Sequence, residues 1–382
     1  MMEYVNLGDV ATYINGYAFK PEQRGKKGLP IIRIQDLNGN SHDLGFFDGE
    51  YPEQVEINTG DILISWSGSL GVYKWNKGKA LLNQHIFKVL FNKIKIDKEY
   101  FCYAIRNSLS SMSQQTHGAT MKHITKKDFD NISIPYPDLN EQKKIANNLN
   151  IVNKLIMFYE KELILFEQMV KARFIEMFGD PIINSFRIET KPMTDVCEII
   201  DGDRGKNYPT ADEFFDEEYC LFLNAKNVTS TGFNFDTCMF VTKEKDEALR
   251  NGKLSRGDIV LTTRGTLGNL AFYTKAIPFE HVRINSGMVI LRTKQDVVDE
   301  VYFIEQFKMQ LANIREKIAS GSAQPQLPIS TMNKINILIP DIEKQRQFAD
   351  FVQQVDKSRE EVKKSLEKTQ QLYDSLMQEY FG

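Results

Sequence analysis

An internal duplication constrains the fold of this sequence more than any other feature. The segment PDLNEQKKIANNLNIVNK, which begins at Pro137, returns as PDIEKQRQFADFVQQVDK, which begins at Pro340. From there the two copies stay in register without a gap, so that residues 178–179 match residues 381–382. Self-similarity over such a long stretch indicates that one structural unit occurs twice in the chain.

The duplication extends upstream, where the second copy carries insertions. GDILISWSGSLG, which begins at Gly60, matches GDIVLTTRGTLG, which begins at Gly257. The separation between the copies only increases along the chain, as expected if the extra residues lie in loops, which tolerate insertions. Further matched pairs are Asp9 with Asp195, Asp36 with Asn227, and Asn83 with Asn285.

Each copy begins with a mixed part, residues 1–137 and residues 181–340. Both contain short β-rich runs, such as DILIS, HIFKVLF, IVLTT and MVILRT, between Gly, Asn and Asp turn signals. Helical patterns also occur around residues 100–111 and 301–319. We therefore predict two homologous globular α+β domains, related by a pseudo-two-fold internal repeat.

The remaining parts, residues 138–180 and 341–382, have the pattern of two long helices. Apolar residues recur at steps of four and three, which is typical of a coiled-coil seam. At 1.5 Å per residue, each helix would be roughly 60 Å long. Arg359 and Thr369 put polar side chains at seam positions, where they would fix the register. The predicted packing residues are Ile145, Leu149, Val152, Ile156, Leu163 and Phe166 in the first helix, and Phe348, Val352, Val355 and Leu366 in the second.

The overall charge argues against a strongly basic nucleic-acid binder. The chain has 48 Lys and Arg residues against 51 Asp and Glu residues, a formal net charge of −3. No global positive field therefore draws it to nucleic acid or to an anionic membrane. Any phosphate contact must come from local cationic clusters, and such clusters occur in the loops.

Metal, secretion and membrane signals are missing. The four cysteines include no CxxC pair, and the five histidines show no HxxxH spacing, which argues against a zinc site. The first residues lack the basic and apolar pattern of a signal peptide, and no apolar run is long enough to span a membrane. We expect a cytoplasmic protein with no membrane segment and no metal.

Signatures of common enzymes are missing as well. The sequence has no GxGxxG after a strand, no GxxxxGK[ST], no HExxH and no GxSxG. It also lacks the glycine-rich cofactor loop and the Asn-Pro-Pro-aromatic motif of an adenine methyltransferase. PDLNEQK superficially suggests a nuclease site, but Asp138 and Asp341 stand where helix N-caps are expected. We expect a chain that binds no cofactor and catalyses no reaction by itself.

The matched glycine-flanked loops are the first candidate binding sites. Trp66 and Ser67 in the first copy are replaced by Thr263 and Arg264 in the second. Glycine lets a backbone approach a ligand closely, although the same pattern also suits an ordinary hairpin.

Two further sets of loop residues carry amide, imidazole and cationic groups, which match base edges and phosphates. For any single member, a solvated surface side chain remains an open alternative. Because the two copies share scaffold residues and differ at these loops, we predict one fold that reads two different ligands. The set before the long helices is Gln115, Lys122, His123, Gln324 and Gln326, and the set near the start of each copy is Arg24, Lys26, Lys27, Arg33, Gln35, Arg204, Lys206 and Lys226.

The chain resembles the specificity subunit of type I restriction-modification systems over essentially its whole length, because these features occur in the same order and are repeated twice. The resemblance is carried by the GDIL…SGSLG and GDIV…RGTLG strands and loops, the GSAQPQL loop, and IPYPDLNEQKKIA and ILIPDIEKQRQFA at the helix starts. One departure is visible. The usual Glu-Gln of the helix start is present at Glu141 and Gln142 but is Lys344 and Gln345 in the second copy.

The resemblance implies that the two mixed parts are target-recognition domains. Each would read one half of a bipartite, asymmetric double-stranded DNA target, and the helices would pack as an antiparallel coiled coil that sets the spacing. The chain itself would not catalyse. Its partners would be two modification subunits, which methylate adenine with S-adenosylmethionine, and restriction subunits, which translocate and cleave DNA with ATP and Mg²⁺.

Two other functions stay open from the residues alone. A structural adaptor would use the same α+β domains and coiled coil to bind only proteins, and it would show no sequence-selective DNA binding. A nuclease or methyltransferase fragment would bind S-adenosylmethionine by itself, which the missing cofactor loop argues against.

Overall fold

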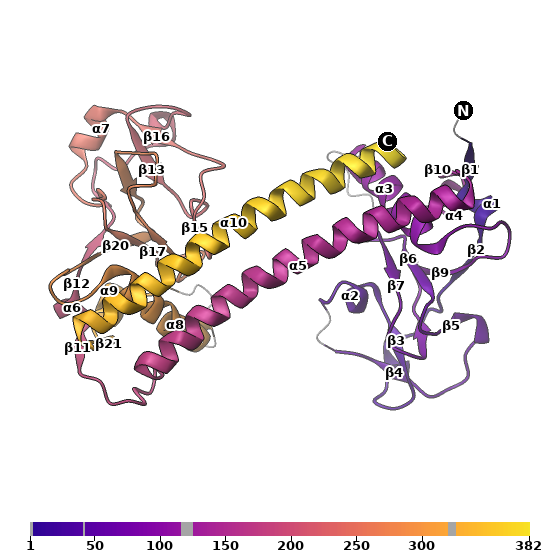
Figure 1. Ribbon diagram of the computed structural model, residues 1–382, viewed down its shortest axis with the longest axis horizontal. Coiled ribbons are helices and arrows are strands. Elements are labelled where there is room, and N and C mark those ends of the chain that lie inside the picture. Colours follow the sequence, from indigo (N-terminus) through magenta and orange to yellow (C-terminus); the bar gives the residue numbers. More distant parts are fainter. Residues whose placement is uncertain (1–2, 41–42, 116–124, 320–325) are drawn as a thin grey trace. The chain divides into compact units, whose positions relative to one another are not determined.

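The structure, a computed structural model, describes residues 3–40, 43–115, 125–319 and 326–382, with the side chains of 111–115 and 317–319 left out. The chain divides into two compact units. One comprises Met1–Glu160 and Lys364–Gly382, and the other comprises Lys161–Lys363 (Figure 1). Each unit therefore contains one mixed domain together with parts of both long helices.

The first mixed domain contains two four-stranded sheets, in the orders β2-β9-β6-β7 and β4-β3-β8-β5. All neighbours are antiparallel except β3 and β8, which run parallel. A separate pair, β1 with β10, joins the start of the domain to the segment that leads into the long helix. The strands are β1 (Tyr4–Asn6), β2 (Thr12–Asn15), β3 (Leu29–Ile32), β4 (Phe46–Phe47), β5 (Glu56–Ile57), β6 (Ile62–Ser65), β7 (Gly71–Lys74), β8 (Ala80–Leu82), β9 (Ile86–Leu90) and β10 (Ser133–Pro135); the helices are α1 (Leu7–Val10), α2 (Ile34–Leu37), α3 (Lys98–Gln115) and α4 (Lys126–Asp130), with 3-10 turns at Pro21–Gln23 and Glu53–Val55.

The second mixed domain repeats this topology. Its sheets have the orders β12-β20-β17-β18 and β16-β13-β19, and β13 and β19 again run parallel. β11 pairs with β21, and β14 pairs with β15. The strands are β11 (Thr190–Pro192), β12 (Cys197–Asp201), β13 (Cys220–Leu223), β14 (Val228–Thr229), β15 (Gly232–Phe233), β16 (Phe240–Val241), β17 (Ile259–Thr262), β18 (Leu270–Phe272), β19 (Val282–Ile284), β20 (Met288–Thr293) and β21 (Asn336–Leu338); the helices are α6 (Met193–Val196), α7 (Lys243–Ala248), α8 (Glu300–Ala319) and α9 (Ile329–Met332), with a 3-10 turn at Ala211–Glu213.

The correspondence between the domains confirms the predicted duplication and the α+β class. Each domain has one antiparallel four-stranded sheet, one sheet with a single parallel pair, and one long helix before the last short strand. The predicted helical stretches around residues 100–111 and 301–319 are α3 and α8.

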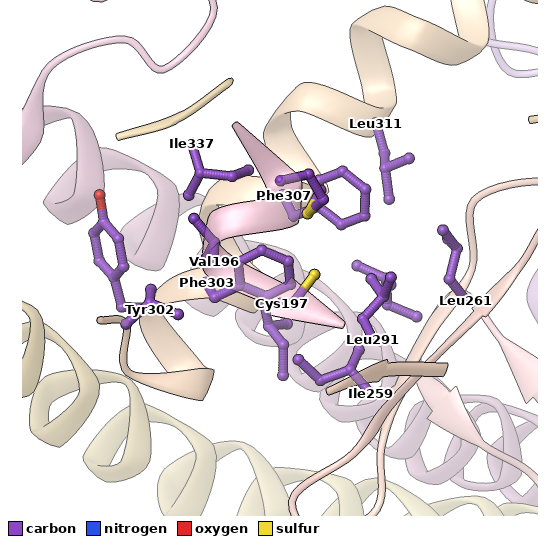
Figure 2. Close-up of a cluster of buried hydrophobic side chains, with 14 of the residues drawn as sticks. Val196, Cys197, Ile259, Leu261, Leu291, Tyr302, Phe303, Phe307, Leu311 and Ile337 are labelled. Atoms are coloured by element: carbon purple, nitrogen blue, oxygen red, sulfur yellow. The ribbon is translucent and has the colours of Figure 1, made fainter. Parts of the chain in front are cut away.

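A helix packed on a sheet forms the core of the second domain (Figure 2). Ile259 and Leu261 alternate along β17, so both side chains point to the same face of the sheet. Phe303, Phe307 and Leu311 recur at intervals of four along α8, which puts them on one stripe of the helix. These five side chains are buried together, and the first domain repeats the arrangement with α3 against its own sheet.

The long helices are α5 (Leu139–Phe178) and α10 (Ile342–Phe381), each of 40 residues. In the first unit, the amide of Asn148 near the start of α5 donates to the hydroxyl of Tyr380 at the end of α10, at 3.2 Å. In the second unit, Phe174 near the end of α5 contacts Phe348 near the start of α10, with ring centroids 5.4 Å apart. The two helices therefore pack together in antiparallel directions, as predicted.

The predicted packing residues fall into two groups. Ile145 and Leu149 are buried in the core of the first unit, and Phe348, Val352 and Val355 are buried in the core of the second. The remaining members lie between these ends or beside the second core: Val152 and Ile156 are buried, while Leu163, Phe166 and Leu366 are half-buried.

Both long helices begin at an aspartate cap, as the sequence predicts. The carboxylate of Asp138 accepts hydrogen bonds from the backbone N–H groups of Asn140 and Glu141, at 2.9 and 3.0 Å. Asp341 accepts the equivalent bond from Glu343 at 2.9 Å. The carboxylates satisfy N–H groups that a helix start leaves without partners, so they cap the two helices.

Candidate nucleic-acid interface

The glycine-flanked loops are hairpin loops with the same backbone in both domains. They join β6 to β7 and β17 to β18, which are antiparallel pairs. The hydroxyl of Ser65 donates to the carbonyl of residue 69 at 2.5 Å, and the hydroxyl of Thr262 donates to the carbonyl of residue 266 at 2.5 Å. Gly68 and Gly265 adopt φ values of +68° and +70°, which side chains disfavour. The glycines are therefore needed for the turn, and the loops differ only in the side chains they carry.

In the first domain, Trp66 packs against its own domain. Its indole lies parallel to the ring of Phe87, with centroids 5.5 Å apart, and its N–H donates to the amide oxygen of Asn15 at 3.2 Å. The half-buried indole therefore supports the loop, and the adjacent Ser67 is also half-buried.

In the second domain, the loop helps to form a hollow of about 300 Å³ that brings four predicted residues together. Arg204, Thr263, Arg264 and Gln326 line it, although they lie far apart in the sequence. The lining is completed by Asp201, Val289, Leu327, Pro328 and Ile329. We call this the 264 hollow.

Backbone hydrogen bonds hold two of the segments together at the 264 hollow. The N–H of Leu327 donates to the carbonyl of Thr263 at 3.1 Å, which fixes the segment that carries Gln326 beside the hairpin loop. The Thr263 hydroxyl donates to the carbonyl of Gly287 at 3.0 Å, so it is engaged within the domain. Arg264 and Gln326 are exposed, so their side chains are accessible to a ligand.

Asp203 orders the loop that carries Arg204 and Lys206. Its buried carboxylate accepts hydrogen bonds from the backbone N–H groups of Gly205, at 2.6 Å, and Arg250, at 2.7 Å. These N–H groups lower the pKa of Asp203, with that of Gly205 contributing most, despite the opposing effect of burial. The ionised carboxylate therefore holds the loop in place at neutral pH.

The chemistry of the 264 hollow suits the edges of DNA bases. A guanidinium donates two parallel bonds to guanine, a glutamine amide pairs with adenine, and a carboxylate accepts from cytosine. Arg264 and Gln326 supply the first two groups, and Asp201 supplies the third. Arg204 donates to Asp201 at 3.1 Å and to the carbonyl of Ser286 at 3.2 Å, so it is partly engaged within the domain.

The cationic set of the first domain lies on two segments. Arg24, Lys26 and Lys27 occupy the connection before β3, where Arg24 is half-buried and both lysines are exposed. Arg33 forms an ion pair with Asp36, with Nε 3.0 Å from the carboxylate, and it also donates to the carbonyl of Asp43. The guanidinium therefore ties the start of α2 to a neighbouring loop, while Gln35 lies exposed on α2.

Some predicted residues fall outside the described part of the structure. They are Lys122, His123, Gln324 and the side chain of Gln115. Of the others, Lys206 and Lys226 are exposed in the second domain.

One residue that the sequence analysis missed is Arg315 of α8. With Lys226 it lines a second, larger hollow of about 620 Å³. We call this the 315 hollow. No sequence signal distinguishes Arg315, because it lies within a helix and has no cationic counterpart at the matched position of the first copy.

Neither a metal site nor a membrane span is found in the described ranges. No three His, Cys, Asp or Glu side chains there are grouped so that they could hold a metal ion. No helix among those residues is both long and apolar enough to cross a membrane.

Duplicated α+β domains, joined by paired long helices and differing at their loops, define a class of two-domain recognition proteins. Comparisons with known proteins identify the class more closely. The family described as "Type I restriction modification DNA specificity domain" matches residues 1–165 and 187–371. The chain therefore belongs to the type I restriction-modification specificity subunit family, whose members are non-catalytic subunits.

Similar proteins match over nearly their full length. The chain is 22% identical to the type I restriction enzyme EcoBI specificity subunit of Escherichia coli, with 99% of this chain and 85% of that protein covered. It is 24% identical to the MjaVIII specificity subunit of Methanocaldococcus jannaschii, with coverages of 97% and 91%.

Solved structures show the same fold. The crystal structure of the S subunit from M. genitalium aligns with a TM-score of 0.57 and 17% identity, over 100% of this chain and 96% of that one. A chain from a structural description of complex assembly and conformational transition of the type I R-M system aligns with a TM-score of 0.53 and 14% identity, over 99% and 97%.

Proposed function

We propose that this chain selects the DNA sequence on which a type I restriction-modification complex acts, and that each mixed domain reads one half of a bipartite target. The observation that carries the proposal is the 264 hollow, where Arg204, Arg264 and Gln326 converge from three separate segments. Amide and guanidinium groups are the side chains that distinguish bases in the major groove. The matched loop of the first domain has the same backbone and different side chains, as expected for a reader of a different half-site.

Long helices that pass between the two domains would set the gap between half-sites. Both α5 and α10 are continuous over 40 residues. A helix of fixed length is a suitable spacer, because recognition elements on a rigid support read sites at a defined separation.

Docking of the modification subunit is proposed for an apolar face of α5 in the first unit. Ile151, Leu155 and Phe158 follow one another at steps of four and three, which puts them on one face. Their exposed fractions are 60%, 42% and 60%. Exposed apolar patches of this kind mark contact sites for other proteins.

The repeat shows that the fold does not require this apolar face. The residues of α10 that match these three positions are Gln354, Ser358 and Glu361, which are polar. The second copy forms an equally long helix without the stripe. We therefore assign the face on α5 to a partner, and within a type I complex the partner is the adenine methyltransferase, or modification, subunit.

The chemistry of the complex would belong to the partners. Two modification subunits would supply S-adenosylmethionine for adenine methylation, and restriction subunits would use ATP and Mg²⁺. This chain would bind double-stranded DNA and orient those subunits on it.

The function is tested by mapping methylated adenines in cells that carry this chain and its modification subunit. Methylation should occur at one split sequence. Arg264→Ala should relax or change one half of that sequence and leave the other half intact, because its side chain lies in one domain only. Lys275→Ala, a change at an exposed lysine of the same domain outside the hollow, is the control.

Two results would contradict the proposal. Unaltered methylation in Arg264→Ala would show that the 264 hollow does not read bases. Changes in both halves would show that the domains do not read independently. A complex with no sequence preference at all would favour the adaptor function.

A further inference from the structure

The two hollows of the second domain share one hairpin loop but differ in chemistry. Thr263 and Arg264 line the 264 hollow, while Gly265, Thr266 and Leu267 line the 315 hollow. A ligand that follows the loop would therefore meet two different surfaces. The 315 hollow is completed by Ala225, Lys226, Val228, Thr229, Ser230, Asn269 and Arg315.

Two cations at the 315 hollow have no carboxylate partner within the described residues. Lys226 and Arg315 are both exposed, and neither forms an ion pair in that part of the chain. Arg204 of the 264 hollow differs, since its guanidinium lies 3.1 Å from the Asp201 carboxylate. The positive charge at the 315 hollow is therefore not neutralised by a neighbouring acid of the described chain.

The fold holds both cations at the hollow. Arg315 donates from Nη2 to the carbonyl of Gly268 at 3.3 Å, which fixes the guanidinium beside the hairpin loop. The backbone N–H of Lys226 donates to the side-chain oxygen of Asn224 at 2.9 Å. The buried Asn227 stabilises the same turn, because its side-chain amide donates to the carbonyls of residues 234 and 237.

Two of the four uncharged polar side chains that line the 315 hollow are engaged inside the domain. Asn269 donates its amide to the carbonyl of Val228 at 3.0 Å, and the hydroxyl of Thr229 donates to the carbonyl of Gly232 at 2.9 Å. The charged groups in the described lining are the two cations, and much of the rest of that lining is apolar, with few directional donors and acceptors. Such a surface suits a phosphate, whereas base recognition requires a defined pattern of both.

We propose that the 315 hollow binds a phosphodiester group of the DNA backbone, through Lys226 and Arg315, next to the bases read at the 264 hollow. This inference rests on the proposed function. Phosphate contacts position a protein on the duplex without reading sequence. The hollow thus sets the register in which Arg264 and Gln326 meet the base edges.

The first copy has no equivalent site at the sequence level. Gln35 stands at the position of Lys226, and Ser113 stands at the position of Arg315. The phosphate contact therefore belongs to the second domain alone, and its removal should leave recognition by the first domain unchanged.

The test measures DNA affinity as a function of salt for the complex of this chain with its modification subunit. Each phosphate contact contributes about 0.9 to the slope of log K against log salt concentration on duplex DNA. The double variant with Lys226→Gln and Arg315→Gln should reduce the magnitude of that slope by about 0.9, the contribution of one phosphate, on the target duplex and on an unrelated duplex alike. The methylated sequence should stay the same.

Two matched variants separate charge from structure. Arg315→Lys keeps the charge but loses the fork-shaped donor, so it should retain the salt slope if the residue binds phosphate. A reduced slope in this variant would indicate that Arg315 affects DNA binding through its hydrogen bond to the Gly268 carbonyl and not through its charge. Lys275→Gln removes an exposed lysine of the same domain outside the hollow and should leave the slope unchanged.

The remaining outcomes are decisive. A wild-type slope in the double variant, with thermal unfolding unchanged, overturns the phosphate site while the proposed function stands. An altered methylated sequence shows that the 315 hollow reads bases and also overturns it. A wild-type complex without sequence-selective binding or methylation overturns the proposed function, and this inference with it.

Discussion

The side-chain oxygen of Gln345 accepts a hydrogen bond from the backbone N–H of Asp299, at 2.9 Å. Gln345 lies in the first turn of α10, and Asp299 caps α8 by accepting from the N–H groups of Val301 and Tyr302. The Gln345 amide also donates to the carbonyl of Pro340 at 2.8 Å. One buried glutamine therefore links the start of a long helix to the start of the core helix beside it.

The first domain contains the same arrangement. Gln142 accepts from the N–H of Asp97 at 2.9 Å and donates to the carbonyl of Pro137 at 2.8 Å. The residue before each glutamine differs in charge between the copies. Glu141 is half-buried and Lys344 is exposed. The glutamine thus carries the structural role of the helix start, and the residue before it is free to vary.

Replacing Gln345 with alanine should destabilise the second unit. The substitution leaves the Asp299 N–H and the Pro340 carbonyl without their partner, at about 1–3 kcal/mol for each buried group. We expect a loss of about 2–4 kcal/mol in the free energy of unfolding, measured by urea denaturation. Gln347→Ala, at an exposed position of the same helix turn, should change stability little. Equal losses in both variants would contradict the role of Gln345.

These glutamines show what the sequence could and could not predict. Gln142 and Gln345 occupy matched positions in the two copies. The duplication correctly predicted two α+β domains and two long helices, and the antiparallel packing of the helices was implied by the family resemblance. Their partners Asp97 and Asp299 were not recognised, because hydrogen bonds between distant segments leave no periodic pattern. The repeat marks residues that matter, but it does not tell which group each one contacts.

The candidate site was predictable to a similar extent. Differences between the copies pointed to Arg264 and to Gln326, which meet at one hollow. Arg315 was missed because helical position and a single occurrence give no signal. The apolar face at Ile151 was missed for another reason. A seam at steps of four and three accounts for one face of the helix only, and Ile151 lies outside that seam.

Asp246→Asn should destabilise the second domain severely. The buried carboxylate pairs with Arg283, which is itself 5% exposed, and with Lys253. Arg283 also donates to the carbonyls of Asn251 and Leu249, at 2.8 and 3.1 Å, so it cannot move out to water without breaking them. Removing one partner of a buried pair costs about 3–5 kcal/mol. Thermal unfolding should reveal this loss of stability in Asp246→Asn. The control variant Asp216→Asn, at an exposed position, should unfold like the wild type.

The same pair predicts how stability depends on pH. Burial raises the pKa of Asp246, but hydrogen bonds from Lys253 and Arg283 outweigh it, so the pKa lies below the ordinary value of 3.8. A lowered folded-state pKa means that the stabilisation is complete above that ordinary value and is lost as the pH falls through the folded value. Acid unfolding of the wild type should therefore show a steeper loss of stability than that of Asp246→Asn. Parallel curves would contradict this assignment.

Polar substitution of the apolar face on α5 should separate assembly from folding. A variant with Ile151→Gln, Leu155→Ser and Phe158→Glu gives α5 the residues that α10 carries at the matched positions. Because these side chains are exposed, the unfolding temperature should change little. Copurification with the modification subunit should be lost. The matched triple variant of α10, with Gln354, Ser358 and Glu361 each changed to alanine, should still assemble, and its failure would place the docking surface elsewhere.

Lengthening both long helices should change only the gap in the DNA target. Seven residues inserted between Glu160 and Lys161 in α5, and seven between Lys363 and Lys364 in α10, keep the heptad pattern of the seam. Each insertion adds about 10 Å of helix, which corresponds to roughly three base pairs at about 3.4 Å each. Mapping of methylated adenines should find both half-sites unchanged and the gap between them longer. Methylation at the original spacing would show that the helices do not set the distance between the two reading domains.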